Sequence, residues 1–242
     1  MRREWHLVPA MLMLLAGIAL VLHGPIRQWP GYHDFADQRV VAGIPHAWDV
    51  LSNIPFALVG LWAGWKTRAA APAPQRAAER VFYLALVLTA AGSAWYHWAP
   101  DNARLVFDRL PIAIACAALL CAMHARILGG RIPGLLPVLL AVAVLSVLWW
   151  DFTQARGAGD LRPYLLLQGA PLVLVPLWQW IHRAPAAERL LLGLAVALYA
   201  AAKVFEIEDR AVLEATGFVS GHTVKHLLAA AASFVICRVL QR

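Results

Sequence analysis

Charged side chains are scarce in this sequence of 242 residues. Asp, Glu, Lys and Arg make up 14% of it and hydrophobic residues make up 61%, whereas a soluble domain carries about 25% charged residues. This composition excludes an ordinary soluble globular domain. It predicts an integral membrane protein.

Cysteine is also rare, with Cys116, Cys121 and Cys237 as the three copies. Each lies within an apolar stretch, so we expect no disulfide bond, and thiolate chemistry is disfavoured in hydrocarbon. The sequence further lacks an internal repeat, a low-complexity linker and the roughly ten-residue alternating pattern of a membrane β-barrel. We therefore expect one compact membrane domain over residues 1–242.

Eight apolar runs account for most of the chain, and each is near the ~17–25 residues that a helix needs to cross the hydrocarbon core. The runs cover residues 6–23, 47–65, 81–98, 107–125, 134–150, 163–181, 190–205 and 220–237. Backbone polar groups in a bilayer must be satisfied within the protein. Runs of this length therefore predict an all-α polytopic membrane bundle with eight spans.

The first run follows Met1-Arg2-Arg3, a beginning that is also typical of a cleavable secretory signal. We favour a retained span, because the run is long for a signal core. In addition, Leu20-Val21-Leu22-His23-Gly24 offers no small-x-small cleavage site. Residues 1–30 would then form an extra N-terminal span.

The distribution of Lys and Arg among the connecting segments predicts the orientation. With a cytoplasmic N-terminus, twelve of these residues lie inside and six lie outside. The inner set is Arg2, Arg3, Lys66, Arg68, Arg76, Arg80, Arg126, Arg131, Arg183, Arg189, Arg238 and Arg242, and the outer set is Arg27, Arg39, Arg104, Arg156, Arg162 and Arg210. This bias places both termini in the cytoplasm, and we assign the protein to a bacterial inner membrane. Contact with anionic lipid headgroups explains the basic inner face, so no nucleic-acid partner is needed.

Five polar side chains stand in or at the edge of the apolar runs, where such groups are costly. His222 and His226 are four residues apart and project from one face of a helix. Ser93 and His97 have the same spacing, and the predicted topology brings both of them, with Asp108, to the outer end of the bundle. Three neutral imidazoles with an open fourth position are a recurrent catalytic zinc arrangement.

This set indicates zinc-dependent hydrolysis, because zinc lowers the pKa of its bound water towards neutrality. Asp108 could orient that water and accept its proton, and Ser93 could hydrogen-bond the oxyanion that forms on a carbonyl. Two other interpretations stay open at this point. The five side chains could bond across helices or line a hydrophilic crevice, or histidines from two helices could be the axial ligands of a b-type haem.

The same residues resemble a known family. Ser93-Ala94-Trp95-Tyr96-His97, then Asp108 and His222-Thr223-Val224-Lys225-His226, resemble the ordered signature of the alkaline ceramidases. Trp48-Asp49-Val50-Leu51-Ser52-Asn53 is similar to part of that family's first core span. The family belongs to a superfamily of seven-span membrane hydrolases that includes the adiponectin-receptor-like proteins. The resemblance covers about residues 34–242, so residues 1–30 would add one span to a seven-span core.

The resemblance implies that His97, His222 and His226 bind Zn²⁺, that Asp108 positions or deprotonates the water, and that Ser93 supports the metal site and the intermediate. It implies hydrolysis of a ceramide amide, on the periplasmic side, to a sphingoid base and a fatty acid. The lipid would enter laterally from the bilayer. Another N-acyl lipid is compatible with these residues, and a receptor-like member of the superfamily is the alternative. The sequence specifies neither the acyl chain nor the oligomeric state.

In the ceramidases an acidic stretch before the first core span binds calcium near the zinc. Asp34 and Asp37 fit that pattern here, whereas Arg39 and His46 stand where oxygen ligands are expected for a hard cation. Ca²⁺ is therefore a secondary expectation, and Arg39 is an alternative source of positive charge in the same place.

Further charged residues lie near the outer ends of the runs 190–205 and 163–181. We expect them to be solvated loop charges with local pairing, such as Lys203 with Glu206. They are Lys203, Glu206, Glu208, Asp209, Asp160 and Arg162.

Overall fold

The computed structural model describes residues 7–66, 73–129 and 132–242. Every regular element in these residues is a helix, and the β pairing within them is limited to one isolated bridge between Val41 and Ile44. The helices are α1 (Val8–His23), α2 (Ala47–Leu51), α3 (Ile54–Trp65), α4 (Ala73–Trp98), α5 (Asn102–Leu128), α6 (Leu135–Gln154), α7 (Arg162–Ile181), α8 (Ala186–Ile207), α9 (Asp209–Thr216) and α10 (Gly221–Leu240). The predicted all-α class is confirmed.

Six of these helices, α4, α5, α6, α7, α8 and α10, are long and apolar enough to cross a membrane. The first two predicted spans look different. α1 is apolar but has 16 residues, and the run 47–65 is divided into α2 and α3. A helical bundle with six helices that could span a membrane is thus confirmed, while the count of eight spans stays a prediction.

Side chains cause the division between α2 and α3. Pro55 has no backbone N–H to continue the helical hydrogen bonds. One turn earlier, the carbonyl of Asp49 accepts side-chain hydrogen bonds from Asn53 Nδ2 at 2.8 Å and from Ser52 Oγ at 3.1 Å. Backbone groups at the break are therefore satisfied locally, as a buried segment requires.

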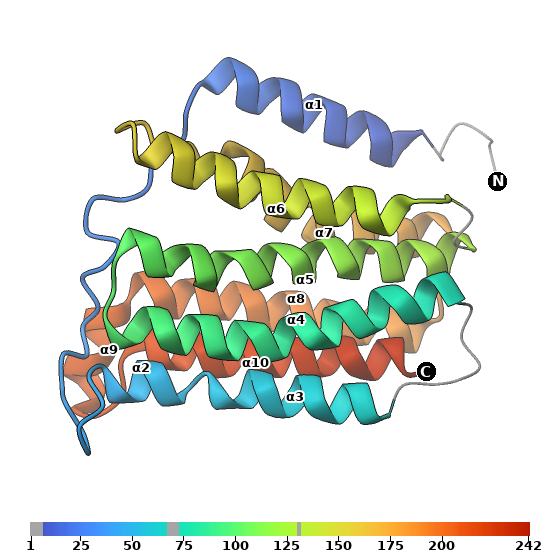
Figure 1. Ribbon diagram of the computed structural model, residues 1–242. Coiled ribbons are helices and arrows are strands. Elements are labelled where there is room, and N and C mark those ends of the chain that lie inside the picture. The colour runs from blue at the N-terminus through green and yellow to red at the C-terminus, as the bar shows by residue number, and fades with distance from the viewer. Residues whose placement is uncertain (1–6, 67–72, 130–131) are drawn as a thin grey trace.

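Six helices form a ring, in the order α3, α4, α5, α7, α8 and α10, and α10 returns to α3 (Figure 1). α6 packs outside the ring against α5 and α7, and α1 packs on α7. α8 packs mainly on α10 and makes few contacts with α7. The junction between α7 and α8 is therefore the most open part of the ring.

α1 begins and α10 ends at the same end of the bundle, as the predicted topology requires (Figure 1). The segment 24–46, α9 and the start of α10 lie at the opposite end, which we call the loop end. Four of the basic residues used to predict the orientation, Arg2, Arg3, Arg68 and Arg131, lie outside the described residues.

Arg162 joins α1 to the bundle at the loop end and pairs locally with Asp160. The expected local pairing is therefore observed, but the expectation of a solvated loop charge is wrong for Asp160. Asp160 is buried and accepts from Arg162 Nη2 at 2.9 Å and from Trp149 Nε1 at 3.0 Å. Burial alone would raise the pKa of Asp160, but these hydrogen bonds outweigh it and lower the pKa to about 2. Arg162 Nη1 also donates to the carbonyl of Leu20 near the end of α1, at 3.2 Å.

α4 and α5 approach each other closely where Gly92 faces the backbone of Phe107. A Cβ atom at Gly92 would clash with the Phe107 carbonyl. The two neighbouring residues, Ser93 and Asp108, therefore come together because position 92 has no side chain.

We expect Gly92→Ala to push α4 and α5 apart and to lower the free energy of unfolding by about 1–3 kcal/mol, the usual range for overpacking. The measurement is the thermal unfolding midpoint of the purified protein in detergent. Gly193→Ala is the matched control, because Gly193 lies in α8 with no atom near the added Cβ. Equal midpoints for the two variants would contradict the close contact.

Candidate metal centre and its cavity

His97 at the end of α4 and His222 and His226 at the start of α10 form one cluster at the loop end. Each offers a ring nitrogen, and the three nitrogens lie within 4.8 Å of one another. The ring centroids are 4.7–5.0 Å apart in all three pairs. All three side chains are buried, with 1–6% of their surface exposed. The predicted meeting of residues 125 positions apart is thus observed.

One pair of ring nitrogens in this cluster has the spacing of two ligands of a tetrahedral metal ion. Nε2 of His97 and Nε2 of His222 are 3.2 Å apart, and two ligands at Zn–N distances of 2.0–2.1 Å would be separated by about 3.3 Å. Nε2 of His226 is buried and has no hydrogen-bond partner in the described part of the chain. An unpartnered buried lone pair beside two others is the donor set that a metal ion satisfies.

Ser52 orients the third histidine. Its Oγ donates to the carbonyl of Asp49 and lies 2.8 Å from Nδ1 of His226. The free lone pair of Ser52 Oγ therefore accepts the Nδ1–H of His226, which leaves the Nε2 lone pair of that ring for a ligand. A hydrogen bond at the far nitrogen is the usual support of a metal-binding imidazole.

The first turn of α10 is fixed by hydrogen bonds from its own residues to α2. Ser220 Oγ and Thr223 Oγ1 donate to Asp49 Oδ1 at 3.0 and 2.6 Å. Ser220 also caps the helix, because its Oγ accepts from the backbone N–H of Thr223 at 3.0 Å. Gly221 permits a close approach to the end of α8, since a Cβ there would clash with the Phe205 carbonyl.

Two side chains close the metal centre. The ring of Phe35, from the segment before α2, lies 4.5 Å from the rings of both His97 and His222. Lys225 Nζ is 3.3 Å from Nε2 of His222 and 3.2 Å from Glu206 Oε1. A bound metal would take the lone pair of His222, and Lys225 would then keep Glu206 as its partner.

Ser93 and Asp108 lie next to the histidine cluster on the cavity side. Both are buried, and the Ser93 side chain lies near the Asp108 carboxylate. Together with His226 they line a cavity of about 330 Å³ inside the ring of helices. The cavity thus places a carboxylate, a hydroxyl and one of the three clustered histidines at its loop end.

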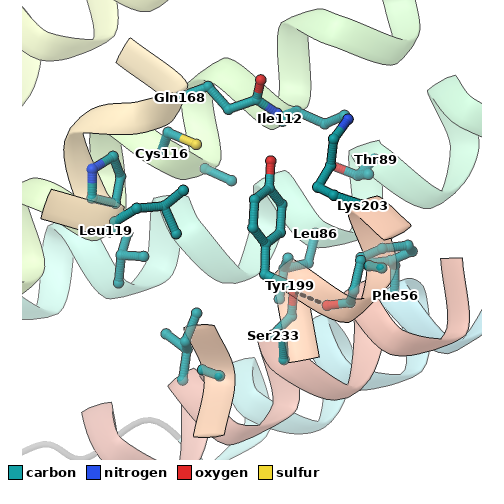
Figure 2. A pocket seen from close by; sticks show the side chains of 18 of the residues that line it. Phe56, Leu86, Thr89, Ile112, Cys116, Leu119, Gln168, Tyr199, Lys203 and Ser233 are labelled. Carbon is teal, nitrogen blue, oxygen red and sulfur yellow. Dashed lines mark hydrogen bonds between the residues drawn. The ribbon is translucent and has the colours of Figure 1, made fainter. Parts of the chain in front are cut away.

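The rest of the cavity is mainly apolar and extends towards the middle of the bundle. Figure 2 shows this part, where Leu86, Ile112 and Leu119 line the cavity together with the polar side chains of Gln168, Tyr199 and Lys203. All six helices of the ring contribute to the wall. Such a space, mainly apolar but with polar side chains in its wall, suits a lipid with a polar head.

The two predicted calcium ligands are not alike in the structure. Asp34 is exposed, whereas Asp37 is fully buried. Arg39 occupies both carboxylate oxygens of Asp37, through Nε at 2.7 Å and Nη2 at 3.0 Å, and His46 Nδ1 lies 2.7 Å from the Asp37 carbonyl oxygen. The cationic group bound to the Asp37 carboxylate in this structure is therefore the guanidinium of Arg39.

The charges near the end of α8 are only partly solvated. Lys203 pairs with Glu206, as predicted. Glu206 also binds Lys225 inside the bundle, however, and Asp209 accepts from the backbone N–H groups of Ala36 and His222 at 2.8 and 2.7 Å. Asp209 thereby connects the segment before α2 to α10. For Glu206 and Asp209 the expectation of fully solvated loop charges is therefore wrong.

Three further residues at the histidine cluster and the cavity were not assigned to the site from the sequence, namely Asp49, Ser52 and Arg109. Asp49 and Ser52 lie in the segment that resembles the ceramidases, but their contacts with α10 join residues more than 170 positions apart. Arg109 is a basic residue inside an apolar run, which is itself a signal of function.

No protein-family model matches the chain, and no curated protein matches it. The likeness to the alkaline ceramidases therefore rests on the residues quoted from the sequence.

We expect Ser52→Ala to weaken zinc binding by about 10- to 100-fold, because Nδ1 of His226 loses its hydrogen-bond partner. The measurement is the zinc dissociation constant, from competition with a chromophoric chelator. Ser146→Ala is the control, since the Ser146 hydroxyl bonds a carbonyl within α6. Unchanged affinity in Ser52→Ala would contradict the supporting role of Ser52.

Proposed function

We propose that the chain is a zinc-dependent membrane hydrolase that cleaves the amide bond of ceramide or a related N-acyl lipid. The products would be a free base and a fatty acid. The observation that carries the proposal is the opening of a buried three-histidine cluster into an apolar cavity whose polar end holds Asp108 and Ser93.

His97, His222 and His226 would hold the zinc ion through their ring nitrogens. When bound, zinc supplies Lewis-acid chemistry and makes a water nucleophilic near neutral pH. The Asp108 carboxylate would accept a proton from the attacking water and later deliver it to the leaving nitrogen. The Ser93 hydroxyl, which lies near Asp108, would hold that carboxylate in place and stabilise the charge that develops on the carbonyl oxygen.

The cavity supports a lipid substrate. Its apolar part can take an acyl chain while the polar head and the scissile bond lie near Asp108. The sparse contact between α7 and α8 offers a lateral path from the bilayer. An apolar substrate that already resides in the membrane needs no soluble carrier.

We further propose eight spans, with α1 as an addition to a seven-span core and with α2 and α3 together forming the second span. The Lys and Arg bias favours cytoplasmic termini in a bacterial inner membrane. Because α1 begins and α10 ends at the end opposite the metal centre, this orientation would direct the centre towards the periplasm.

A receptor-like member of the same superfamily is the alternative, and turnover distinguishes it from a hydrolase. A b-type haem protein is less favoured, because Ser93, Asp108 and one of the three histidines would have no role in it. An absorption spectrum separates haem from zinc, since a haem protein shows a Soret band.

We expect the purified protein to contain one zinc ion and to release fatty acid from N-acyl lipids in detergent. His222→Ala should lose zinc and activity together. Asp108→Asn should keep zinc and lose at least about 100-fold in rate, the usual effect of removing a general base. Zinc is measured by elemental analysis and the products by mass spectrometry.

His124→Ala is the matched control, because His124 lies in α5 outside the cluster and packs on Trp178. It should retain both zinc and activity. Full activity of a metal-free protein, or stoichiometric zinc without turnover of any amide or ester lipid, would overturn the hydrolase assignment.

A further inference from the structure

Arg109 is a buried cation in the wall of the cavity, with 3% of its surface exposed. It lies in α5, next to Asp108 in the sequence and within the apolar run 107–125. An ionisable side chain inside the membrane is costly and usually has a partner with which it works. Arg109 is therefore expected to have a partner.

Aromatic rings surround the guanidinium of Arg109. Its Cζ lies 4.1 Å from the ring centroid of Trp150, 5.0 Å from that of Tyr32 and 5.6 Å from that of Tyr164. Tyr32 and Tyr164 line the cavity, whereas Trp150 does not. The rings hold the guanidinium by cation–π contacts, which satisfy its faces but not its N–H groups.

No carboxylate in the described part of the chain forms a salt bridge with Arg109. Its Nη1 is buried and has no hydrogen-bond partner there. The charge of Arg109 acts on the adjacent Asp108, but the two side chains form no salt bridge. A guanidinium carries five N–H donors in a planar fork that matches a carboxylate or a phosphate, so Arg109 has donors to offer to an anion.

The other charges in the cavity wall favour an anion too. Glu206 is shared between Lys203 and Lys225, and with Arg109 and Asp108 this makes three basic and two acidic side chains around one cavity. With neutral histidines the wall is therefore net positive. A neutral ceramide headgroup makes no use of that charge.

We propose that Arg109 binds an anionic group, a carboxylate or a phosphate, in the head of the lipid that the cavity accepts. The substrate class would then be an anionic N-acyl lipid, such as an N-acyl amino acid or an N-acyl phosphoethanolamine. This inference rests on the proposed function for the hydrolysis of that lipid, but the binding preference can be measured without turnover.

The test compares three ligands with one acyl chain: N-oleoylglycine (carboxylate), N-oleoyl phosphoethanolamine (phosphate) and N-oleoylethanolamine (neutral). Dissociation constants are measured in nanodiscs of zwitterionic lipid, with the full chain carrying His222→Ala to prevent turnover. His222 does not line the cavity, so its wall is kept. At least one anionic ligand should bind about 10-fold or more tightly than the neutral one, and the arm that does so identifies the anion.

Arg109→Gln should weaken binding of the preferred anion by about 10- to 100-fold, as expected for a lost charge-assisted hydrogen bond. Its affinity for N-oleoylethanolamine should stay within about 3-fold, which also shows that the cavity is intact. Arg109→Lys keeps the charge but loses the fork and should give an intermediate loss. Arg104→Gln is the matched control, because Arg104 lies in the same helix and packs on Trp95, but pairs with Asp101 and does not line the cavity.

Equal affinity of the Arg109-containing protein for all three ligands would overturn the inference, even if Arg109→Gln fails to fold. A preference that persists in Arg109→Gln would overturn it as well. Hydrolysis of neutral amides without a preference for anionic ligands would refute only the role of Arg109. A preference for anionic ligands without hydrolysis of any of the three ligands would refute only the proposed hydrolase.

Discussion

Asp49 accepts hydrogen bonds from Ser220 and Thr223 across the contact between α2 and α10, and the geometry of the metal centre depends on this contact. Both bonds go to Oδ1, whereas Oδ2 is buried with no hydrogen-bond partner in the described part of the chain. Loss of either bond would therefore leave more of a buried carboxylate unsatisfied, which is costly. The same short helix α2 is followed by Ser52, which bonds His226. The helix α2 and the residue that follows it therefore set both the position of the first turn of α10 and the orientation of the His226 ring.

The close approach of α4 and α5 at Gly92 completes the arrangement from the other side. It brings Ser93 on α4 and Asp108 on α5 together at the loop end of the cavity. Polar chemistry is thus concentrated at one end of an apolar space. This arrangement is possible in a membrane protein because lipid contacts the outside of the bundle, so that polar groups can face the interior.

Much of the site was predictable because helices have a fixed rise per residue and successive spans alternate in direction. These two constraints place Ser93, His97 and Asp108 at the same depth as the histidines of α10. The break between α2 and α3 was not predictable, since it depends on side chains that bond their own backbone. The surroundings of Arg109 were not predictable either, because its three aromatic neighbours come from separate segments that only the packing brings together: Tyr32, Trp150 and Tyr164.

The hydrogen bond between Ser52 and His226 also bears on how such a protein is assembled in the cell. Because Nδ1 of His226 is already bonded and the rings of His97 and His222 are packed against Phe35, the side chains have lost their rotational freedom once the helices have packed. Metal binding then requires little further ordering of the protein. Insertion of the helices and binding of the proposed metal can therefore be separate events.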